Sequence, residues 1–245
     1  MHPINRLLNN FGLRLAFVRR MPGTFKKEYR RRYAELKRNN KGFDVFKEIY
    51  YEVGSHPMQH SDFELAFASG LIAKYEPERI LDIGSWRYWI IGLLAHYNVT
   101  TIDVRDRRPV MDNETVVTSD AKELRLQANT FDAVTSVCAL EHFGLGRYGD
   151  DFDLDADRKA IREWTRVLKP GGHLIFTTQI TRGQPSIGFN GGRIYNYDMI
   201  RLLCTGLTCI EEKFFNKDLE GFCRLEEVRA KPKHWDVYCG CWSKR

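Results

Sequence analysis

The sequence predicts an α/β fold in which a mostly parallel sheet carries helices on both faces. Short apolar runs alternate with segments of helical period from about residue 62 to residue 206, the pattern of a doubly wound sheet. The last two runs, LTCIEEKFF and HWDVYCGCW, are joined by a polar connection without a clear helix. We therefore expect these two strands to pair antiparallel at the end of the parallel sheet.

The expected elements follow one another along the chain. A helix over FELAFASGLIAKY precedes the strand RILDIG, which leads into a helix over RYWIIGLLAHY and a second strand, VTTIDV. Next come a strand at ETVVTS, a helix over AKELRLQA (residues 121–128) and a strand at FDAVTSVCAL. A helix over DRKAIREWTRVLK, a strand at GGHLIFTTQI and a helix near YDMIRLLCTG complete the alternation. One long irregular segment, residues 142–157, follows the fourth strand, and long loops in compact domains are usually functional or disordered.

Charge divides the chain unequally. With 245 residues, of which 43% are hydrophobic, the chain can bury one sizeable core. The net charge is +6, but residues 1–50 hold thirteen Lys/Arg against four Asp/Glu, a net of +9 that leaves −3 for the rest. We therefore predict a basic helical extension over residues 1–54 and one domain over residues 55–245.

Within the extension, apolar residues recur at helical spacing over residues 4–18, and the arginines lie mostly off that face. Such a helix can lie in an anionic membrane interface, where each basic residue contributes about 1 kcal/mol. Docking on its own domain or on a partner subunit explains the pattern equally well. Acidic residues interrupt the run KKEYRRRYAELKR, which disfavours nucleic acid as the partner.

The expected location follows from what the sequence lacks. No apolar run approaches the roughly 20 residues that cross a bilayer, and no signal-peptide pattern begins the chain. We expect a cytoplasmic protein, with residues 1–20 as a candidate attachment to the inner face of the membrane. The sequence leaves the oligomeric state open.

Carboxylates stand at three successive strand ends. Asp82 ends the first strand, Asp103 follows 21 residues later at the end of the second, and Asp120 closes the third. An acidic residue at the position of Asp103 commonly binds both ribose hydroxyls of an adenosine cofactor, because a carboxylate offers two acceptors to two donors. Asp120 is placed to meet the adenine amino group. Together the three carboxylates predict an adenosine site.

The turn after the first strand narrows the choice of cofactor. Dinucleotide sites use G-x-G-x-x-G so that backbone amides approach the phosphates, whereas Gly84 is followed here by Ser85-Trp86-Arg87. A phosphate-free adenosine ligand does not need that approach. S-adenosylmethionine (SAM) is therefore the predicted cofactor.

Four segments, ILDIGS, TTIDVRD, FDAVTSVCALEHFGLGRYGD and RVLKPGGHLIF, resemble the successive motifs of class I SAM-dependent methyltransferases. The closer resemblance is to a subgroup, catalogued largely as a domain of unknown function, with E-H-x-G-L-G-R-Y-G-D after the fourth strand and F-N-x-x-R-I-Y after the fifth. These occur here as Glu141–Asp150 and Phe189–Tyr195. The resemblance covers roughly residues 55–242. It implies a SAM-dependent methyltransferase (EC 2.1.1.-) with a Rossmann-like, seven-stranded sheet and a reversed final hairpin.

The resemblance also implies a set of cofactor-binding residues. The methionine end of SAM is expected against the first turn, the ribose on the second strand end, the adenine near the third, and the floor under the sulfonium after the fourth. In this order the residues are Asp82, Gly84 and Ser85, then Asp103, then Asp120 and Ala121, and then Ser136 to Leu140. Trp86 stands where the class often has glycine, so its side chain is expected beside the cofactor and could take up space that the cofactor or water needs.

Methyl transfer to a hydroxyl requires alignment and removal of a proton. His142 is the candidate base, because histidine ordinarily titrates near neutral pH, and Glu141 is expected to orient it or to bind the acceptor. One of the two could instead only brace the loop.

Four further residues are predicted to bind the acceptor, because guanidinium groups bind anions and aromatic rings stack on sugars. They are Arg147, Tyr148, Arg193 and Tyr195. Alternatively, Arg147 pairs with nearby aspartates and fixes the loop.

No metal site is predicted, and the sequence leaves open whether a catalytic divalent ion binds in the cleft. The run DFDLDAD places oxygen ligands at alternate positions, but Ala156 and Arg162 stand where a calcium-binding EF-hand loop has Gly and Glu. The six cysteines contain no C-x-x-C pair and are expected to be buried thiols, with Cys239 and Cys241 on one face of a strand.

The sequence thus predicts a SAM-dependent O-methyltransferase that acts on a small polar or sugar/glycan acceptor. A basic leader before this domain resembles bacterial enzymes of surface-polysaccharide assembly. The alternative is a non-catalytic member of the fold that serves as a scaffold or binding protein at a membrane surface. Nucleic-acid methylation is disfavoured, because SVCALEHF stands where base methylases often carry N/D-P-P-Y/F.

Overall fold

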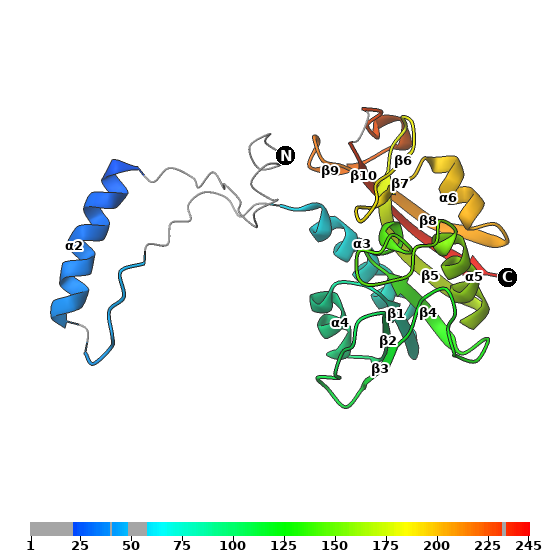
Figure 1. The fold of residues 1–245 in the computed structure, drawn as a ribbon, viewed down its shortest axis with the longest axis horizontal. Helices are drawn as coiled ribbons and strands as arrows, with labels where there is room; N and C mark the ends of the chain where they lie inside the picture. Colours follow the sequence, from blue (N-terminus) through cyan, green and yellow to red (C-terminus); the bar gives the residue numbers. More distant parts are fainter. Residues whose placement is uncertain (1–21, 40, 49–57, 232–233) are drawn as a thin grey trace. The chain divides into compact units, whose positions relative to one another are not determined.

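A computed structural model of the chain describes residues 22–39, 41–48, 58–231 and 234–245. The chain forms two compact units, Met1–Pro57 and Met58–Arg245. The first unit contains helix α2 (Gly23–Asn39; Figure 1). This helix buries no side chain, and Arg31 and Arg32 form ion pairs with Glu28 on its surface. The amphipathic helix predicted over residues 4–18 lies outside the described residues.

The second unit is built on one mixed sheet, in the strand order β3-β2-β1-β4-β5-β10-β8-β9 (Figure 1). Strands β3, β2, β1, β4 and β5 run parallel, and β10 pairs antiparallel with both β5 and β8. The bounds are β1 Arg79–Ile83, β2 Asn98–Asp103, β3 Glu114–Thr118, β4 Phe131–Ser136, β5 Leu168–Ile180, β8 Leu207–Asn216, β9 Gly221–Cys223 and β10 Asp236–Lys244. The predicted parallel sheet and antiparallel final pair are confirmed.

Strand β9 extends the predicted sheet. Its three residues pair antiparallel with the end of β8, which gives the described sheet eight strands instead of the seven that the resemblance implied. The strand lies in the polar connection between β8 and β10, where its short length left no periodic pattern to detect.

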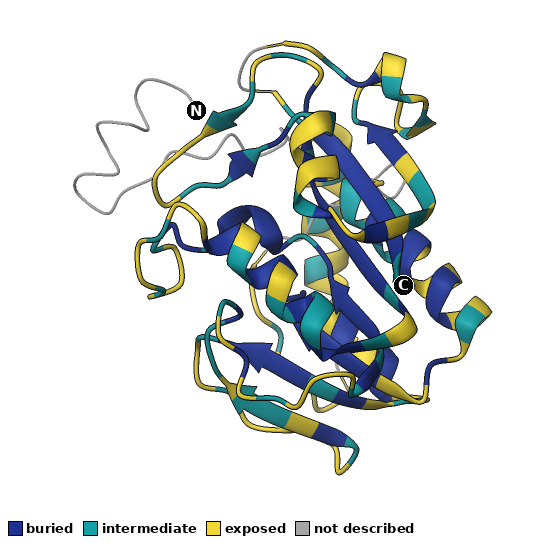
Figure 2. Ribbon diagram, turned by 90° about the vertical axis from the view of Figure 1, so that its right-hand side faces the viewer, coloured by how far each residue is buried: buried dark blue, intermediate teal, exposed yellow. Residues whose placement is uncertain are grey.

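Helices cover both faces of the sheet, and the alternation of side chains along each strand divides the core in two. Ile80 and Ile175 pack in one cluster with residues of α3 (His60–Tyr75) and α4 (Arg87–Leu94). Their neighbours Leu81 and Phe176 pack in the other with Trp164 of α5 (Ala156–Val167) and with α6 (Tyr197–Leu203). Figure 2 shows the central strands buried between helices whose outer faces are exposed.

Smaller elements complete the unit. A two-stranded sheet pairs β6 (Ser186–Ile187) with β7 (Arg193–Ile194), and short 3-10 helices occur at η1 (Leu140–His142) and η2 (Leu225–Glu227). Among the described helices, none has the length and hydropathy that crossing a bilayer would require.

The helix predicted over residues 121–128 is absent, and turns replace it. Tertiary contacts take up the backbone groups that a helix would have used. The amide of Leu124 donates to Glu163, and the guanidinium of Arg166 donates to the carbonyls of Leu124 and Leu126. Helix α5 thus holds this segment in an open conformation that its own sequence does not favour.

All six cysteines are free thiols, and each is at least partly buried. Cys239 and Cys241 both lie in the core cluster beneath α3 and α4, so they share one face of β10 as predicted.

Candidate active site

A cleft of about 780 Å³ opens at the carboxyl ends of β1, β2 and β4, where a parallel α/β sheet ordinarily binds its ligands. Many of the residues predicted from the sequence line it: Gly84, Ser85, Trp86, Asp103, Asp120, Ala121, His142, Arg147 and Tyr148. The remaining predicted residues lie behind its wall or away from it: Asp82, Ser136, Leu140, Glu141, Arg193 and Tyr195.

The turn after β1 depends on Gly84. Its φ is +69°, and a Cβ at this position would lie 3.3 Å from the Cβ of Ala139 and 3.5 Å from the ring of Phe143. Only glycine combines this backbone conformation with so close an approach. Trp86 lies at the rim of the cleft, with 54% of its surface exposed and its ring edge-to-face with Tyr88. The indole therefore borders the cleft and does not fill it.

Asp82 lies fully buried beneath this turn. Its carboxylate accepts hydrogen bonds from the Ser85 amide (3.3 Å), the Trp89 indole (3.1 Å) and the Thr135 hydroxyl (2.8 Å). Burial raises the pKa of Asp82 to about 6, although these hydrogen bonds favour the ionised form. Asp82 thus fixes the turn from behind.

Ser136 and Leu140 also lie behind the wall. The Ser136 hydroxyl donates to the carbonyl of Ile83 at 2.9 Å, and both side chains are fully buried. The cleft wall in this segment is formed instead by Val137, Cys138 and Ala139.

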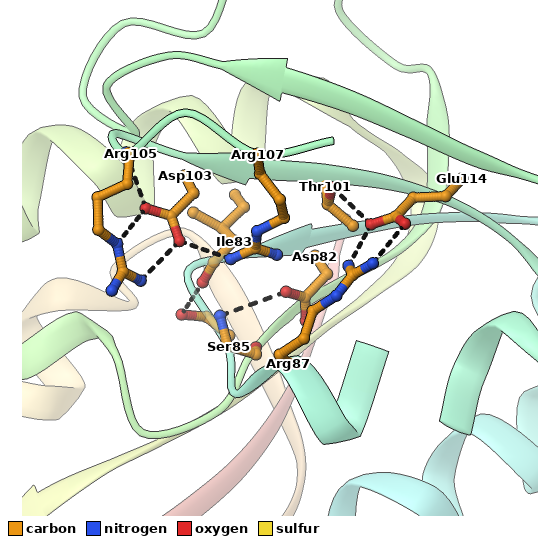
Figure 3. A network of polar contacts seen from close by, with 10 residues as sticks. Asp82, Ile83, Ser85, Arg87, Thr101, Asp103, Arg105, Arg107 and Glu114 are labelled. Carbon is orange, nitrogen blue, oxygen red and sulfur yellow. Dashed lines mark hydrogen bonds and ion pairs between the residues drawn. The ribbon is translucent and has the colours of Figure 1, made fainter. Parts of the chain in front are cut away.

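Asp103 lines the cleft, but two arginines hold its carboxylate (Figure 3). Arg105 donates from its backbone amide (2.9 Å), its Nε (2.9 Å) and its Nη2 (2.8 Å), and Arg107 donates from Nη2 at 2.6 Å. Burial raises the pKa of Asp103, but the hydrogen bonds and positive charge of the two arginines outweigh it and keep the pKa below the usual value. The predicted ribose ligand is therefore ionised and already paired.

Arg107 contributes an unused donor to the same part of the cleft. Its Nη1 is buried and has no hydrogen-bond partner among the described residues. Leaving a buried donor unpaired costs about 1–3 kcal/mol, and more for a charged group, which a ligand oxygen at this point would relieve. Asp120 lies nearby on the cleft wall, where one carboxylate oxygen accepts from the amide of Lys122 at 2.9 Å.

His142 enters the cleft from η1, directly after β4. Its Nδ1 lies 2.5 Å from the carbonyl oxygen of Gly191, so Nδ1 carries the proton and Nε2 the lone pair. Gly191 and Gly192 belong to the F-N-x-x-R-I-Y segment, and a Cβ on Gly192 would lie 3.3 Å from His142 Nδ1. The two segments that carry the closer resemblance thus meet at this imidazole.

Glu141 lies behind His142 and is fully buried. It accepts hydrogen bonds from Thr178 (3.1 Å) and from the thiol of Cys138 (3.5 Å), and its Oε1 is 3.8 Å from His142 Nε2. The structure therefore separates the two candidates, since His142 faces the cleft and Glu141 supports it.

Arg147 and Tyr148 lie at the mouth of the cleft. Arg147 donates to the same Gly191 carbonyl at 3.2 Å, and the Tyr148 ring lies edge-to-face with His142, with ring centroids 5.8 Å apart. The guanidinium of Arg105 stacks over the Tyr148 ring at 4.5 Å. The loop after β4 is thereby connected to the arginine that pairs with Asp103.

Arg193 and Tyr195 do not reach the cleft. Arg193 donates to the carbonyls of Phe143 (2.5 Å) and Leu154 (3.1 Å) and pairs with Asp157 at 3.5 Å. The Tyr195 hydroxyl donates to Asp157 at 2.9 Å, and burial together with that carboxylate raises the pKa of Tyr195. In this structure the two residues predicted to bind the acceptor lie away from the cleft, and their polar atoms are used to fasten the loop after β4.

The sequence interpretation missed two residues of the cleft wall, His60 and Glu64, which lie close to Cys138 of the segment after β4. Glu64 is buried, and it accepts a 2.6 Å hydrogen bond from Thr177. Burial raises the pKa of Glu64 to about 8, with a further contribution from Glu141. The sequence feature that could have revealed the two residues is their spacing. A histidine and a glutamate four residues apart at the start of a helix lie on the same face of that helix.

Comparisons with solved structures agree with the fold. NodS, an N-methyltransferase from Bradyrhizobium japonicum WM9, is 17% identical with a TM-score of 0.52, over 75% of this chain and 95% of that chain. The 1,6-didemethyltoxoflavin-N1-methyltransferase of Burkholderia thailandensis, solved with 1,6-didemethyltoxoflavin and S-adenosylhomocysteine, is 14% identical with a TM-score of 0.56, over 94% and 93%. The [4+2]-cyclase SpnF is 17% identical with a TM-score of 0.57, over 80% and 85%.

At these identities the structural likeness establishes the fold alone, and one of the three proteins is named for a different reaction. No curated protein matches the chain in sequence. The methyltransferase domain family, however, matches residues 81–176, which run from β1 through the loop after β4 into β5. The chain therefore carries a class I SAM-dependent methyltransferase domain, and its cofactor is S-adenosylmethionine.

Proposed function

We propose that this methyltransferase methylates a hydroxyl group of a small polar acceptor, with a sugar or glycan as the favoured class. The observation that carries the proposal is the 2.5 Å contact between His142 Nδ1 and the Gly191 carbonyl, because a proton held on Nδ1 leaves Nε2 free to accept one from a hydroxyl bound in the cleft that His142 lines. A hydroxyl has to lose its proton when it is methylated, so a positioned base belongs to this chemistry.

The residues of the cleft fit the cofactor. When bound, SAM supplies a methyl group on a sulfonium, which a nucleophile displaces in line. The buried, unpartnered Nη1 of Arg107 would gain an acceptor from a ribose hydroxyl beside Asp103. We propose cofactor-binding roles for residues at four places: the β1 turn (Gly84, Ser85 and Trp86, with Asp82 behind them), the ribose (Asp103 and Arg107), the adenine (Asp120 and Ala121) and the segment after β4 (Ser136 to Leu140).

For Asp103 to bind the ribose hydroxyls, one of the two arginines must release its carboxylate. Arg105 is the candidate, because 53% of its side chain is exposed, whereas Arg107 is only 17% exposed. Because solvent can rehydrate its half-exposed guanidinium, Arg105 leaves the Asp103 carboxylate more readily than Arg107 when ribose hydroxyls take its place. The two arginines therefore take different parts, Arg107 as a fixed donor and Arg105 as a displaceable one.

In the proposed reaction, Nε2 of His142 takes the proton of the acceptor hydroxyl. The imidazolium that forms lies 3.8 Å from Oε1 of Glu141, close enough for the carboxylate to stabilise its charge. The bond from Nδ1 to Gly191 holds the ring orientation through this step. Arg147 and Tyr148, at the mouth, are proposed to bind the acceptor, and the arginine favours one that carries negative charge.

Calorimetry with S-adenosylhomocysteine, the demethylated cofactor, tests the site. Asp103→Asn should weaken binding at least tenfold, a loss of about 1.4 kcal/mol, because the ribose loses a charged acceptor. Arg105→Gln should bind at least as tightly as the native chain, since it frees the carboxylate. The exposed Asp151→Asn serves as the matched control. Native affinity in the Asp103 variant would contradict the proposed ribose contact.

Release of S-adenosylhomocysteine in the presence of monosaccharides and sugar phosphates tests the reaction. His142→Gln should lower the turnover with an accepted sugar by about 10² to 10⁴, while the affinity for S-adenosylhomocysteine stays within about threefold. Turnover with amines and none with any hydroxyl acceptor would overturn O-methylation.

We further propose that the basic leader attaches the enzyme to the inner face of an anionic membrane, as suits surface-polysaccharide biosynthesis. The support is compositional, since residues 1–20 contain four arginines and no acidic residue. Deletion of residues 1–20 should release the protein from phosphatidylglycerol vesicles but change nothing with neutral vesicles. Unchanged sedimentation with anionic vesicles would refute the attachment.

A further inference from the structure

We propose that His60, Glu64 and Cys138 form a binding site for a divalent transition metal, with Zn²⁺ as the ion that best matches the three ligands. The site lies on the wall of the cleft that is formed by the first turns of α3 and by the loop after β4. His60 and Glu64 carry no role assigned above, whereas Cys138 belongs to the segment after β4 that is proposed to lie beside the cofactor, and Glu141 is its neighbour.

The geometry brings the three donor atoms together from distant parts of the chain. His60 and Glu64 are four residues apart on α3 and share one face, with Nε2 and Oε2 3.9 Å apart. Cys138 approaches from the end of β4 with a φ of +54°, uncommon for a residue other than glycine. The ligand atoms of all three lie within 4.8 Å of one another.

The buried carboxylate of Glu64 supplies the observation that points to a ligand. Only 2% of its side chain is exposed, and its Oε1 accepts the Thr177 hydroxyl at 2.6 Å. Its Oε2, the oxygen that faces His60, is buried and has no hydrogen-bond partner among the described residues. A buried acceptor left unpaired is unfavourable, and a metal ion at this point would satisfy it.

The charges around the site favour a cation. The Cys138 thiol donates to Glu141 at 3.5 Å, so a second carboxylate adjoins the proposed ligands. The nearby cation Lys217 is stacked over the Trp235 ring, with its ammonium 3.1 Å from the ring centroid. With a metal bound, Glu64, Glu141 and the Cys138 thiolate would carry three negative charges against the one positive charge of Lys217, and a divalent ion balances the difference.

The ligand types select the metal. Imidazole nitrogen, thiolate sulfur and carboxylate oxygen are the donors of zinc, whereas Mg²⁺ and Ca²⁺ prefer oxygen alone. Tetrahedral zinc with bonds of about 2.0 to 2.3 Å keeps its ligands roughly 3.3 to 3.8 Å apart, so the ligand cluster would close by about 1 Å on binding. The metal replaces the thiol proton and any proton on Glu64, and these are released to solvent.

Three protein ligands leave a fourth position for water or substrate, as in catalytic zinc sites. All three proposed ligands line the cleft, so an acceptor hydroxyl could bind there and lose its proton more readily. This catalytic use rests on the proposed O-methylation, whereas metal binding itself does not.

Cobalt substitution tests the site on the full-length chain, freed of metal with a chelator and kept reduced. Titration with Co²⁺ should give one equivalent bound, with visible bands of a tetrahedral ion and a sulfur-to-cobalt charge-transfer band, and Zn²⁺ should abolish both. Cys138→Ser should lose the charge-transfer band. His60→Asn, at a half-exposed position that tolerates substitution, and Glu64→Gln should weaken Co²⁺ binding at least tenfold.

Cys209→Ser is the matched control, because this half-buried thiol belongs to β8 and does not line the cleft. It should keep the complete cobalt spectrum. A folded native chain without the bands, or bands that persist in Cys138→Ser, would overturn the site. Because no cofactor or acceptor enters this experiment, its failure is distinct from a failure of the proposed methyl transfer.

Discussion

At the scale of single residues, two carboxylates that look alike in the sequence behave in opposite ways. Asp82 is sealed under the β1 turn among neutral donors, and burial raises its pKa to about 6. Asp103 is also shielded from water, but the guanidinium groups of Arg105 and Arg107 keep its pKa below the usual value. The partners of each carboxylate, and not its position at a strand end, decide its charge.

Asp82 should make the stability depend on pH. Because its folded pKa of about 6 exceeds the ordinary 3.8, the stability it contributes is complete below pH 3.8 and is lost as the pH rises through 6. The unfolding free energy of Asp82→Asn relative to the native chain should therefore rise by about 2 kcal/mol from pH 4 to pH 7. Urea unfolding at both pH values measures this, with the exposed Asp112→Asn as control. A difference that does not vary with pH would contradict the assignment.

Gly84 should tolerate no side chain. Gly84→Ala places a Cβ at positive φ, 3.3 Å from Ala139, and should destabilise the fold by about 1–3 kcal/mol. Gly92→Ala, on the exposed face of α4 with nothing within 4 Å of the new Cβ, should stabilise it by up to about 1 kcal/mol. Thermal and urea unfolding of the pair measure both effects, and equal stabilities would refute the role of the turn.

At the scale of elements, strand β7 of the small β6–β7 sheet holds the loop after β4 in place. Arg193 of β7 donates to loop carbonyls at both ends, Phe143 and Leu154, and pairs with Asp157 in the first turn of α5. The same segment supplies the Gly191 carbonyl to His142. The two segments that carry the family resemblance therefore form one structural assembly around the imidazole.

Loss of the Arg193 guanidinium should thus lower stability through packing and hydrogen bonding. Arg193→Met leaves Asp157 without its buried cation and several carbonyls without donors, and should destabilise the fold by about 3 kcal/mol. Its affinity for S-adenosylhomocysteine should stay within about threefold of the native value. The exposed Arg125→Met should change the unfolding free energy by less than about 0.5 kcal/mol. A stable Arg193→Met variant that loses acceptor binding would restore the substrate-binding role predicted from the sequence.

At the scale of the whole molecule, every described residue of the site lies in one of the two units. All the residues that line the cleft and both core clusters come from Met58–Arg245, whereas α2 buries no side chain. The positive charge, by contrast, is concentrated in residues 1–50. The cofactor chemistry and the basic character are therefore carried by different parts of the chain.

Removal of residues 1–57 should consequently leave the methyltransferase unit folded. The fragment 58–245 should keep the affinity of the full chain for S-adenosylhomocysteine within about twofold, because it contains every described residue of the core clusters and the cleft. Calorimetry on the fragment and the full chain, side by side, gives the comparison. A fragment that unfolds or no longer binds would show that the extension supports the site.

The sequence by itself determined the alternation of strands and helices, the antiparallel final pair and the carboxylates at three strand ends. These follow from hydrophobic period and local spacing, which act within a few residues. The same reasoning predicted a helix over residues 121–128, where contacts from Glu163 and Arg166 override the local preference.

Only the tertiary structure decided which polar groups meet. In the fold, Arg193 and Tyr195 are buried and hold the loop after β4, and two arginines pair with Asp103. The fold also brings Cys138 close to His60 and Glu64. The physical reason is that a polar side chain takes its role from the partners and the burial that the fold provides, and those partners lie far away along the chain. The turn after β1, with its single glycine, illustrates both sources of information. The sequence of the turn disfavoured a cofactor that contains a pyrophosphate. The structure then placed Trp86 at the rim of the cleft.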